Sequence, residues 1–404
     1  MTGPLHGLRI FDLSRVLAGP SCTQLLGDLG ADVIKIERPG AGDDTRSWGP
    51  PFLAGPDGEE TQESAYFLST NRNKRSLTLD IARPEGADLA RRLIGHCDVL
   101  VENFKTGGLK KYGLSYDDLS GNNRGLVYCS ITGFGQTGPF AERPGYDFLI
   151  QGMGGIMSVT GEPGGEPMKV GVAIADLMTG MYASSAILAA LYHRDKTGRG
   201  QYIDLALLDT QVAWLANQGL NYLTSGVAPG RLGNEHPNIV PYKVLPCADG
   251  YFILAVGNDR QYQAFCRFAG APELAEDARF RTNAVRVRHR EALYALLAEL
   301  TVGRPRDAWV DGLTAAGVPC GLVNTIDQVF AHPQVQAREM EITMAHPATR
   351  GGVSLIGNPI KYSETAADYR LAPPILGQHT DEVLGELLGL GVAEVAALRE
   401  RGVV

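Results

Sequence analysis

Apolar runs of strand length alternate with helix-like segments along the first two hundred residues of the chain. The strand-like runs are Leu8–Leu13, Val33–Ile36, Leu77–Ile81, Asp98–Val101 and Leu126–Ile131, and a period of two continues over Gln201–Leu208. Helical patterns lie at Cys22–Leu29 and Glu85–Ile94, and the small apolar residues of Ile174–Tyr192 indicate a buried helix. This alternation predicts an α/β fold in which helices cover a parallel sheet.

The middle third of the chain has a different pattern. A polar stretch rich in glycine and proline, from about Thr224 to Asn238, is typical of a linker. Two strand-like runs within Tyr242–Val256 then flank an Asp-Gly turn signal. Helical patterns follow at Gln261–Ala269 and Arg290–Leu300. We therefore expect a separate, smaller α+β domain in the middle of the chain.

Composition narrows the possible classes of protein. The 404 residues carry a formal net charge of −8, which argues against a general nucleic-acid binder because such proteins usually present a basic face. The six cysteines have no CxxC spacing, so we expect a reducing compartment and no bound metal. The start of the chain does not resemble a secretory signal, and the longest apolar stretch, Ala183–Leu191, is too short to span a bilayer. These features predict a cytoplasmic protein that has no membrane or nucleic-acid partner.

Asp147 is the first candidate for chemistry. It lies between two glycine-rich turns within Ile131–Gly155, after an apolar run. Glycines let a backbone approach a ligand closely, so a lone carboxylate among them is a candidate nucleophile or base. Alternatively, Asp147 caps a helix that starts near Phe148, since aspartate is favoured at that position. The spacing alone leaves both interpretations open.

The chain contains a match to the dinucleotide-binding fingerprint, but the sequence around the match does not fit such a site. Gly133–Gly138 matches GxGxxG after a predicted strand. However, Pro144 and Gly145 would end any helix that started at Pro139, so no long helix could face a pyrophosphate. A nicotinamide cofactor is therefore not indicated, and the chain contains no GxxxxGK[ST] loop either.

Two further features have both a functional and an ordinary interpretation. Three cations lie within Asn71–Arg75, and Lys35 and Arg38 follow another strand. Such a cluster is either a solvated basic patch or an anion site for phosphates. His236, in the linker, is either a general base near the substrate or a surface residue.

An ordered series of motifs resembles the family III CoA-transferases, which include formyl-CoA and carnitine CoA-transferases. The series comprises RVLAGP (15–20), GADVIKIERPGAGDDTR (30–46), NRNKRS (71–76), VENF (101–104), SITGFGQTGP (130–139), GYD (145–147), GVAIADLMTG (171–180), KTGRGQYID (196–204), GNEHPNIVPY (233–242), AGVPCG (316–321) and GQHT (377–380).

The resemblance implies a fold in which both chain ends build a Rossmann-like large domain. The predicted boundaries are residues 1–223 for its N-terminal part, 224–330 for the linker and small domain, and 331–404 for the part that returns to the large domain. Two such chains would interlock as a homodimer.

The resemblance also implies the roles of individual residues. Asp147 would be the nucleophilic aspartate, and the CoA site would contain Arg38, Asn103, Phe104 and Lys111, with Lys74 and Arg75 near the nucleotide phosphates. Attack of Asp147 on a thioester would give an aspartyl anhydride, and the CoA thiolate would then form an enzyme-bound CoA thioester. The CoA thioesters would be substrates, and no permanently bound cofactor is expected.

The linker and GDDTRSWGPPF (42–52) are similar to the branch that uses succinyl-CoA and dicarboxylates, and Leu17 stands where formyl-CoA transferases have a glutamine. Arg15, Arg46 and Arg72 could pair with a distal carboxylate. One alternative is an α-methylacyl-CoA racemase-type isomerase, which would have GHD where this chain has Gly145, Tyr146 and Asp147. A second alternative is a non-catalytic CoA-binding protein.

Overall fold

The computed structural model describes residues 3–404 and divides the chain into two compact units. Unit 1 contains the residues up to 155 together with Gly171–Trp214 and Pro333–Val404. Unit 2 contains Ile156–Val170 and Leu215–His332. Each unit is thus built from segments that are far apart in the sequence.

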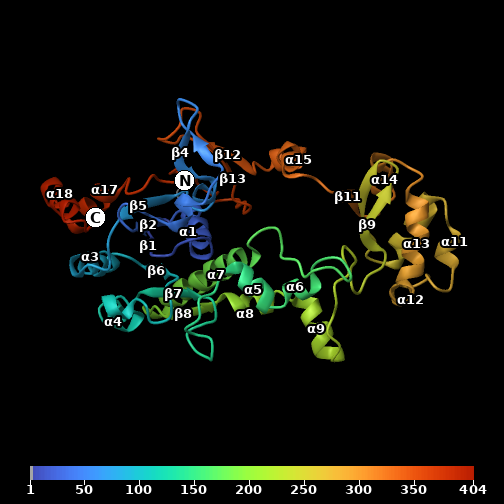
Figure 1. The fold of residues 1–404 in the computed structure, drawn as a ribbon, viewed down its shortest axis with the longest axis horizontal. Coiled ribbons are helices and arrows are strands. Elements are labelled where there is room, and N and C mark those ends of the chain that lie inside the picture. Colours follow the sequence, from blue (N-terminus) through green and yellow to red (C-terminus); the bar gives the residue numbers. More distant parts are fainter. Residues whose placement is uncertain (1–2) are drawn as a thin grey trace. The chain divides into compact units, whose positions relative to one another are not determined.

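Unit 1 is built on a six-stranded parallel sheet (Figure 1). Its strands are β1 (Arg9–Asp12), β2 (Asp32–Glu37), β5 (Lys74–Thr78), β6 (Val99–Glu102), β7 (Val127–Thr132) and β8 (Tyr202–Ala206). They lie in the order β5-β2-β1-β6-β7-β8, the 3-2-1-4-5-6 order of a doubly wound Rossmann-type fold. The predicted α/β class and parallel sheet are confirmed.

Alternate residues of each strand enter two different cores, one on each face of the sheet. Phe11 of β1 belongs to the core formed with α3 (Pro84–Ile94), α17 (Thr380–Leu388) and α18 (Val392–Glu400). Its neighbour Ile10 belongs to the core formed with α1 (Ala18–Asp28) and α7 (Ile174–Thr197). This period of two explains why the strands are nearly continuous apolar runs, since both faces are covered.

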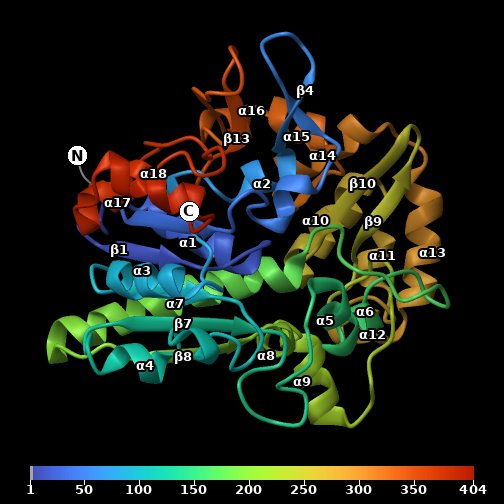
Figure 2. The same ribbon diagram turned by 60° about the vertical axis from the view of Figure 1, so that its left-hand side comes forward.

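Helix α7 is long and apolar enough to cross a membrane by length and composition. In unit 1, however, its residues Ala183, Ile187 and Ala190 are buried in the core beside α1 and β7. Figure 2 shows α7 lying along the sheet. It is a core helix of unit 1, as its pattern of small apolar residues predicted.

The remaining elements of unit 1 are short. They are η1 (Asp44–Ser47), the hairpin β3 (Phe52–Ala54) and β4 (Glu60–Ser64), α2 (Ala65–Ser69), η2 (Lys110–Tyr112), α4 (Tyr116–Ser120), α5 (Asp147–Met153), α8 (Leu207–Ala213), α16 (Pro333–Ala337), and the hairpin β12 (Glu341–Met344) and β13 (Val353–Ile356).

Unit 2 has its own small sheet and core. The sheet has the order β11-β10-β9, with β9 (Tyr242–Cys247), β10 (Gly250–Ala255) and β11 (Cys320–Leu322) antiparallel. Its helices are α6 (Ile156–Val159), α9 (Ala216–Ser225), α10 (Asp259–Ala269), α11 (Glu273–Glu276), α12 (Asn283–Arg288), α13 (Arg290–Thr301), α14 (Arg306–Ala315) and α15 (Ile326–Ala331). Trp309 is fully buried and stacks on Phe252 with ring centroids 5.6 Å apart.

Two sequence-based boundaries were wrong. The strand expected at Leu77–Ile81 lies three residues earlier, at Lys74–Thr78, because the charged residues Lys74 and Arg75 are buried by ion pairing and take part in the sheet. The segment expected to be linker from Thr224 begins with the end of α9, which extends to Ser225.

The Trp309 stack gives a test of the unit 2 core. Replacing Trp309 with alanine should lower the free energy of unfolding by about 3–5 kcal/mol, because it removes a buried ring and leaves a cavity. Urea unfolding of the full chain, followed by circular dichroism, measures this change. Tyr251→Ala is the matched control, since Tyr251 is next to Phe252 but exposed, and a comparable loss there would contradict the assignment.

Candidate active site

The carboxyl ends of the parallel strands surround a cavity of about 180 Å³ in unit 1. It lies beside the ends of β1, β6 and β7, and its lining includes Val16, Asn103, Phe104, Gly133, Tyr146 and Asp176. The strand order reverses between β1 and β6. Ligands of doubly wound folds bind at such a reversal point, so the topology marks this cavity as a candidate site.

A reciprocal pair of hydrogen bonds joins β1 to β6 at this edge. The Arg15 backbone N–H donates to Asn103 Oδ1 at 2.9 Å, and Asn103 Nδ2 donates to the Arg15 carbonyl at 2.7 Å. The Arg15 guanidinium pairs with Asp44 at 2.9 Å and lies 5.7 Å from the centroid of the Phe104 ring. The two predicted residues Arg15 and Asn103 are therefore brought together in the cavity wall.

A second cavity, of about 270 Å³, shares Arg15, Asp44 and Phe104 with the first. Arg38 and Tyr112 are among its other lining residues. The neighbouring Lys111 places its ammonium 4.7 Å from the centroid of the Tyr112 ring. Because the cavities share a wall, an elongated ligand could extend from Arg38 past Phe104 to Asp176.

Two glycines of the predicted glycine-rich region are in direct contact. A Cβ atom added to Gly145 would lie 2.3 Å from the Gly133 Cα. Only glycine permits this approach, which brings the turn before α5 against the end of β7. The glycine pattern around Asp147 is thus explained by backbone packing in the cavity wall.

The carboxylate of Asp147 is held from three directions. Its Oδ1 accepts the backbone N–H groups of Ala175 at 2.8 Å and Asp176 at 3.4 Å, and its Oδ2 accepts Gln151 Nε2 at 2.7 Å. Ala175 and Asp176 belong to the first turn of α7, whose N–H groups attract negative charge. Asp147 therefore does not cap its own helix, as one interpretation had it: it caps α7.

Asp176 is a functional candidate that the sequence analysis missed. It is 9% exposed, it lines the first cavity, and its carboxylate has no hydrogen bond or ion pair within residues 3–404. Burial raises the pKa of Asp176 to about 7, and the charge of Asp147 adds to this shift. An acid in the first turn of a helix whose first five turns are otherwise made of small, apolar and uncharged residues was the available signal. Such a carboxylate is poised to change protonation near neutral pH.

The structure does not support phosphate binding by Lys74 and Arg75. The Lys74 side chain is fully buried and donates to Asp12 at 3.2 Å, to Asn71 and to the Pro20 carbonyl. Arg75 pairs with Asp32, and also with carboxylates of α17. These cations neutralise internal carboxylates, and burial keeps them away from a ligand.

Arg46 and Arg72 are likewise committed to buried partners. Arg46 pairs with Glu37 at 2.7 Å and with Glu63 at 3.2 Å. Arg72 pairs with Asp28 at 2.6 Å. Neither lines the first cavity, so the structure does not support their predicted contact with a distal carboxylate. Of the three arginines suggested for that contact, Arg15 lines the cavity.

His236 belongs to unit 2. Its Nδ1 accepts the backbone N–H of Asn238 at 3.1 Å, and its ring lies 5.3 Å from that of Tyr242. Partial burial, with the nearby charge of Arg290, lowers the pKa of His236. Its role near the substrate stays a prediction.

Comparison with known proteins decides the family. The model of CoA-transferase family III matches residues 5–380 of this chain. The chain belongs to CoA-transferase family III. This family III CoA-transferase is 50% identical over 386 residues to a succinate–glutarate CoA-transferase of Agrobacterium fabrum, covering 95% of this chain and 96% of that one.

Two further similarities extend over nearly the whole enzyme. The succinyl-CoA:glutarate CoA-transferase of Homo sapiens is 43% identical over 401 residues, which are 99% of this chain and 90% of that one. The crystal structure of a CAIB/BAIF family protein from Brucella suis has a TM-score of 0.84 and 51% identity, covering 96% of this chain and all of that one. The resemblance deduced from the motifs is confirmed.

The buried position of Asp176 predicts that this residue destabilises the folded CoA-transferase. Its pKa is about 7 in the fold against an ordinary value of 3.8. Between these pH values the Asp176 carboxyl is therefore ionised in the unfolded chain and protonated in the folded chain. The destabilisation grows as the pH rises and is complete above pH 7. Asp176→Asn should therefore raise the free energy of unfolding by about 2–4 kcal/mol at pH 8 and by less at pH 5.

Denaturant unfolding at the two pH values measures this difference. Asp195→Asn is the control, because Asp195 is exposed on the same helix. Equal effects of Asp176→Asn at pH 5 and pH 8 would show that its carboxyl titrates normally.

Proposed function

We propose that this enzyme transfers CoA from succinyl-CoA to a dicarboxylic acid through covalent intermediates on an aspartate. The observation that carries the proposal is the buried carboxylate of Asp176 in the first cavity, beside Asp147, which accepts the backbone N–H of Asp176. The names of the two similar enzymes, which refer to succinate or succinyl-CoA and to glutarate, support these substrates.

We infer that CoA extends along the second cavity and delivers its thioester to the first. Arg38 is exposed there and has no ion pair among the described residues, so it is available to a phosphate. Phe104 and Asn103 would contact the part of CoA that passes between the cavities, and Lys111 would lie beside it. CoA thioesters are then substrates, and the proposed chemistry uses no resident cofactor.

Either carboxylate of the pair could be the nucleophile, and the geometry favours Asp176. Both oxygens of Asp147 accept hydrogen bonds, and Asp147 is not among the lining residues of the first cavity. Asp176 lines that cavity without a partner inside residues 3–404. The raised pKa of Asp176 also makes its ionised carboxylate more basic and hence a stronger nucleophile. The role predicted for Asp147 thus passes, in this proposal, to its neighbour.

The proposed reaction begins with two acyl transfers at Asp176. A carboxylate oxygen of Asp176 attacks the thioester carbonyl, the C–S bond breaks, and an anhydride and the CoA thiolate form. The thiolate attacks the aspartyl carbonyl of the anhydride, which releases succinate and leaves CoA on Asp176. The acceptor acid repeats both exchanges in reverse, so that it leaves as a CoA thioester and Asp176 is regenerated.

Asp147 supports this chemistry through its position. Its negative charge raises the pKa of Asp176, and its hydrogen bonds hold the first turn of α7, which carries Asp176. We therefore expect Asp147 to orient the nucleophile and to tune its basicity. Water must stay out of the cavity while the anhydride exists, since hydrolysis of the anhydride would consume succinyl-CoA without transferring CoA.

The two alternatives are weaker. A racemase-type isomerase needs an acid–base pair across the α-carbon, and Tyr146 stands where a histidine would serve it. Tyrosine titrates far above neutral pH in its unperturbed state. A non-catalytic CoA-binding protein would have no need of a buried carboxylate that titrates near pH 7.

We further propose that the enzyme is a homodimer of interlocked chains in the cytoplasm, with the large domain formed by both chain ends. On α7, Met181, Leu188 and Tyr192 form an exposed apolar stripe at helical spacing. Unit 1 alone leaves this stripe uncovered, and a second copy would bury it. All six cysteines are free thiols, which fits a reducing compartment.

Mass spectrometry with succinyl-CoA and glutarate tests the proposed function. We expect glutaryl-CoA as product and, in the absence of acceptor, a CoA adduct on the peptide that carries Asp176. Asp176→Asn should lose adduct and exchange by about 10⁴-fold or more, whereas Asp147→Asn should retain the adduct with slower turnover. An adduct on Asp147 would reverse the two roles. No exchange, together with deuterium uptake at the α-carbon of an acyl-CoA, would establish an isomerase instead.

The pH profile gives an independent test. Because attack requires the ionised carboxylate, kcat/KM should rise with pH and level off above about pH 7, the value to which burial and Asp147 raise the pKa of Asp176. In Asp147→Asn the midpoint should move to lower pH, since the repelling charge is gone. An unchanged midpoint in that variant would show that another group controls the profile.

The exposed stripe of α7 predicts the oligomeric state. Light scattering should give the mass of a dimer for the wild-type chain, and the double substitution Leu188→Lys with Tyr192→Lys should shift the equilibrium to monomers. Glu400→Lys, an exposed change on α18, should leave the dimer intact. A monomeric wild-type enzyme would refute the proposed assembly.

A further inference from the structure

Val16 has a backbone conformation that its side chain disfavours. Its φ of 70° lies in the left-handed region, where a β-branched residue is a clear outlier. Four non-glycine residues of the described chain have positive φ, and of these Val16 is the one that lines the first cavity. Strained conformations persist when their surroundings hold them, and they gather at functional sites.

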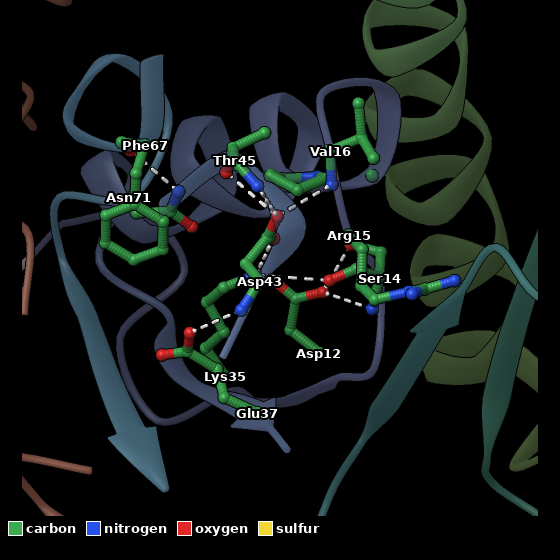
Figure 3. A network of polar contacts seen from close by, with 12 residues as sticks. Asp12, Ser14, Arg15, Val16, Lys35, Glu37, Asp43, Thr45, Phe67 and Asn71 are labelled. Carbon is green, nitrogen blue, oxygen red and sulfur yellow. Dashed lines mark hydrogen bonds and ion pairs between the residues drawn. The ribbon is translucent and has the colours of Figure 1, made fainter. Parts of the chain in front are cut away.

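The holding group is the carboxylate of Asp43. Its Oδ1 accepts the backbone N–H of Val16 at 3.2 Å, together with the N–H and the hydroxyl of Thr45 at 3.0 and 2.8 Å. Its Oδ2 accepts Lys35 Nζ at 2.8 Å. Figure 3 shows Asp43 at the centre of these contacts, between Lys35 and Val16.

Lys35 fixes the same turn a second time. Its ammonium, which is completely buried, also donates to the Ser14 carbonyl at 3.1 Å, two residues before Val16. Burial by itself would lower the pKa of Lys35, but Asp43, Asp12 and Glu37 raise it. Burial would likewise raise the pKa of Asp43, but Lys35 and the Thr45 hydrogen bonds bring it to about 2. Both groups stay charged, so the clamp persists across the neutral pH range.

The clamped turn leads directly into helix α1. Leu17 is the N-cap of α1 and no side chain caps this helix. Within residues 3–404 the N–H groups of Leu17 and Ala18 have no acceptor, and both residues line the first cavity. A helix N-terminus favours an oxygen that becomes negative. Asp176, buried and without a partner in the described chain, lines the same cavity.

Close packing fixes α1 against α7 and hence against Asp176. A Cβ atom added to Gly180 would lie 2.3 Å from Ser21 Oγ and 2.7 Å from the Ala18 carbonyl oxygen. Gly180 follows Asp176 by four residues on α7, so both lie on one face of that helix. The first turn of α1 is therefore packed against the part of α7 that carries Asp176.

We propose that the buried Lys35–Asp43 pair is a positioning device, which holds Val16 in its strained conformation so that the N–H groups of Leu17 and Ala18 meet the acyl oxygen. This inference rests on the proposed function. When Asp176 attacks, the carbonyl oxygen takes up the negative charge before the C–S bond breaks and the thiolate leaves. Fixed N–H donors stabilise that charge, and small displacements of them are costly. Asp43 lines the second cavity, but its side chain and that of Lys35 have no exposed surface, so the pair acts through the turn.

A double-mutant cycle tests the device with succinyl-CoA and glutarate. Asp43→Asn removes the charge that binds Lys35, and it should lower kcat by about tenfold or more while the KM for succinyl-CoA changes by less than about threefold. Val16→Gly should raise the melting temperature, because glycine adopts positive φ without strain, and its own kcat is the reference for the combined variant. The combined variant should recover most of the kcat lost in Asp43→Asn. Asp57→Asn, in an exposed loop, is the control.

Each outcome bears on a separate claim. Absence of CoA exchange in the wild-type enzyme would refute the proposed function itself. With an active wild type, equal kcat in Asp43→Asn, or no recovery in the combined variant, would refute the positioning role. If Asp43→Asn does not fold, Val16→Gly alone tests the strain at Val16. A melting temperature of Val16→Gly below that of the wild type would show that Val16 stores no strain and would refute the device.

Discussion

Buried ion pairs at the carboxyl edge of the sheet are the constraint on which the site depends. Lys35 with Asp43 and Lys74 with Asp12 have no exposed side-chain surface. Removing one partner of such a pair costs about 3–5 kcal/mol, because the other charge is left uncompensated. The turns after β1 and β2 are therefore fixed by charges that must stay together, and these turns form the wall of the first cavity.

The same burial has the opposite effect on Asp176. Asp12 and Asp43 each have a buried ammonium beside them, whereas Asp176 has the carboxylate of Asp147 as its neighbour. One environment keeps carboxylates ionised and structural, and the other raises the pKa of a carboxylate into the range useful for catalysis. The paired acids Asp12 and Asp43 thus contribute to the stability of the fold, whereas the unpaired acid Asp176 lowers it.

Several parts of this protein could be predicted from the sequence because they depend on local patterns. Strands buried on both faces are apolar runs, and helices of an α/β unit must lie between them. The order of the strands in the sheet was visible only in the structure, because it depends on which strands pair with each other. The motif series had nevertheless indicated the family. The glycine turns around Asp147 were expected to let the backbone approach a ligand, whereas in the fold Gly133 and Gly145 approach each other.

The arrangement of the candidate site could not be predicted from local sequence patterns. The sequence determined the alternation of elements, the family and the presence of acids and cations near glycine-rich turns, since these follow from residue type and spacing. Only the tertiary structure decided which of those groups face a ligand. It buried Lys74, Arg75, Arg46 and Arg72 against carboxylates, tied Asp147 to the start of α7, and left Asp176 open to the cavity. The reason is physical: a charge becomes structural or chemical according to its partner and its exposure, and both are set by residues far away in the sequence.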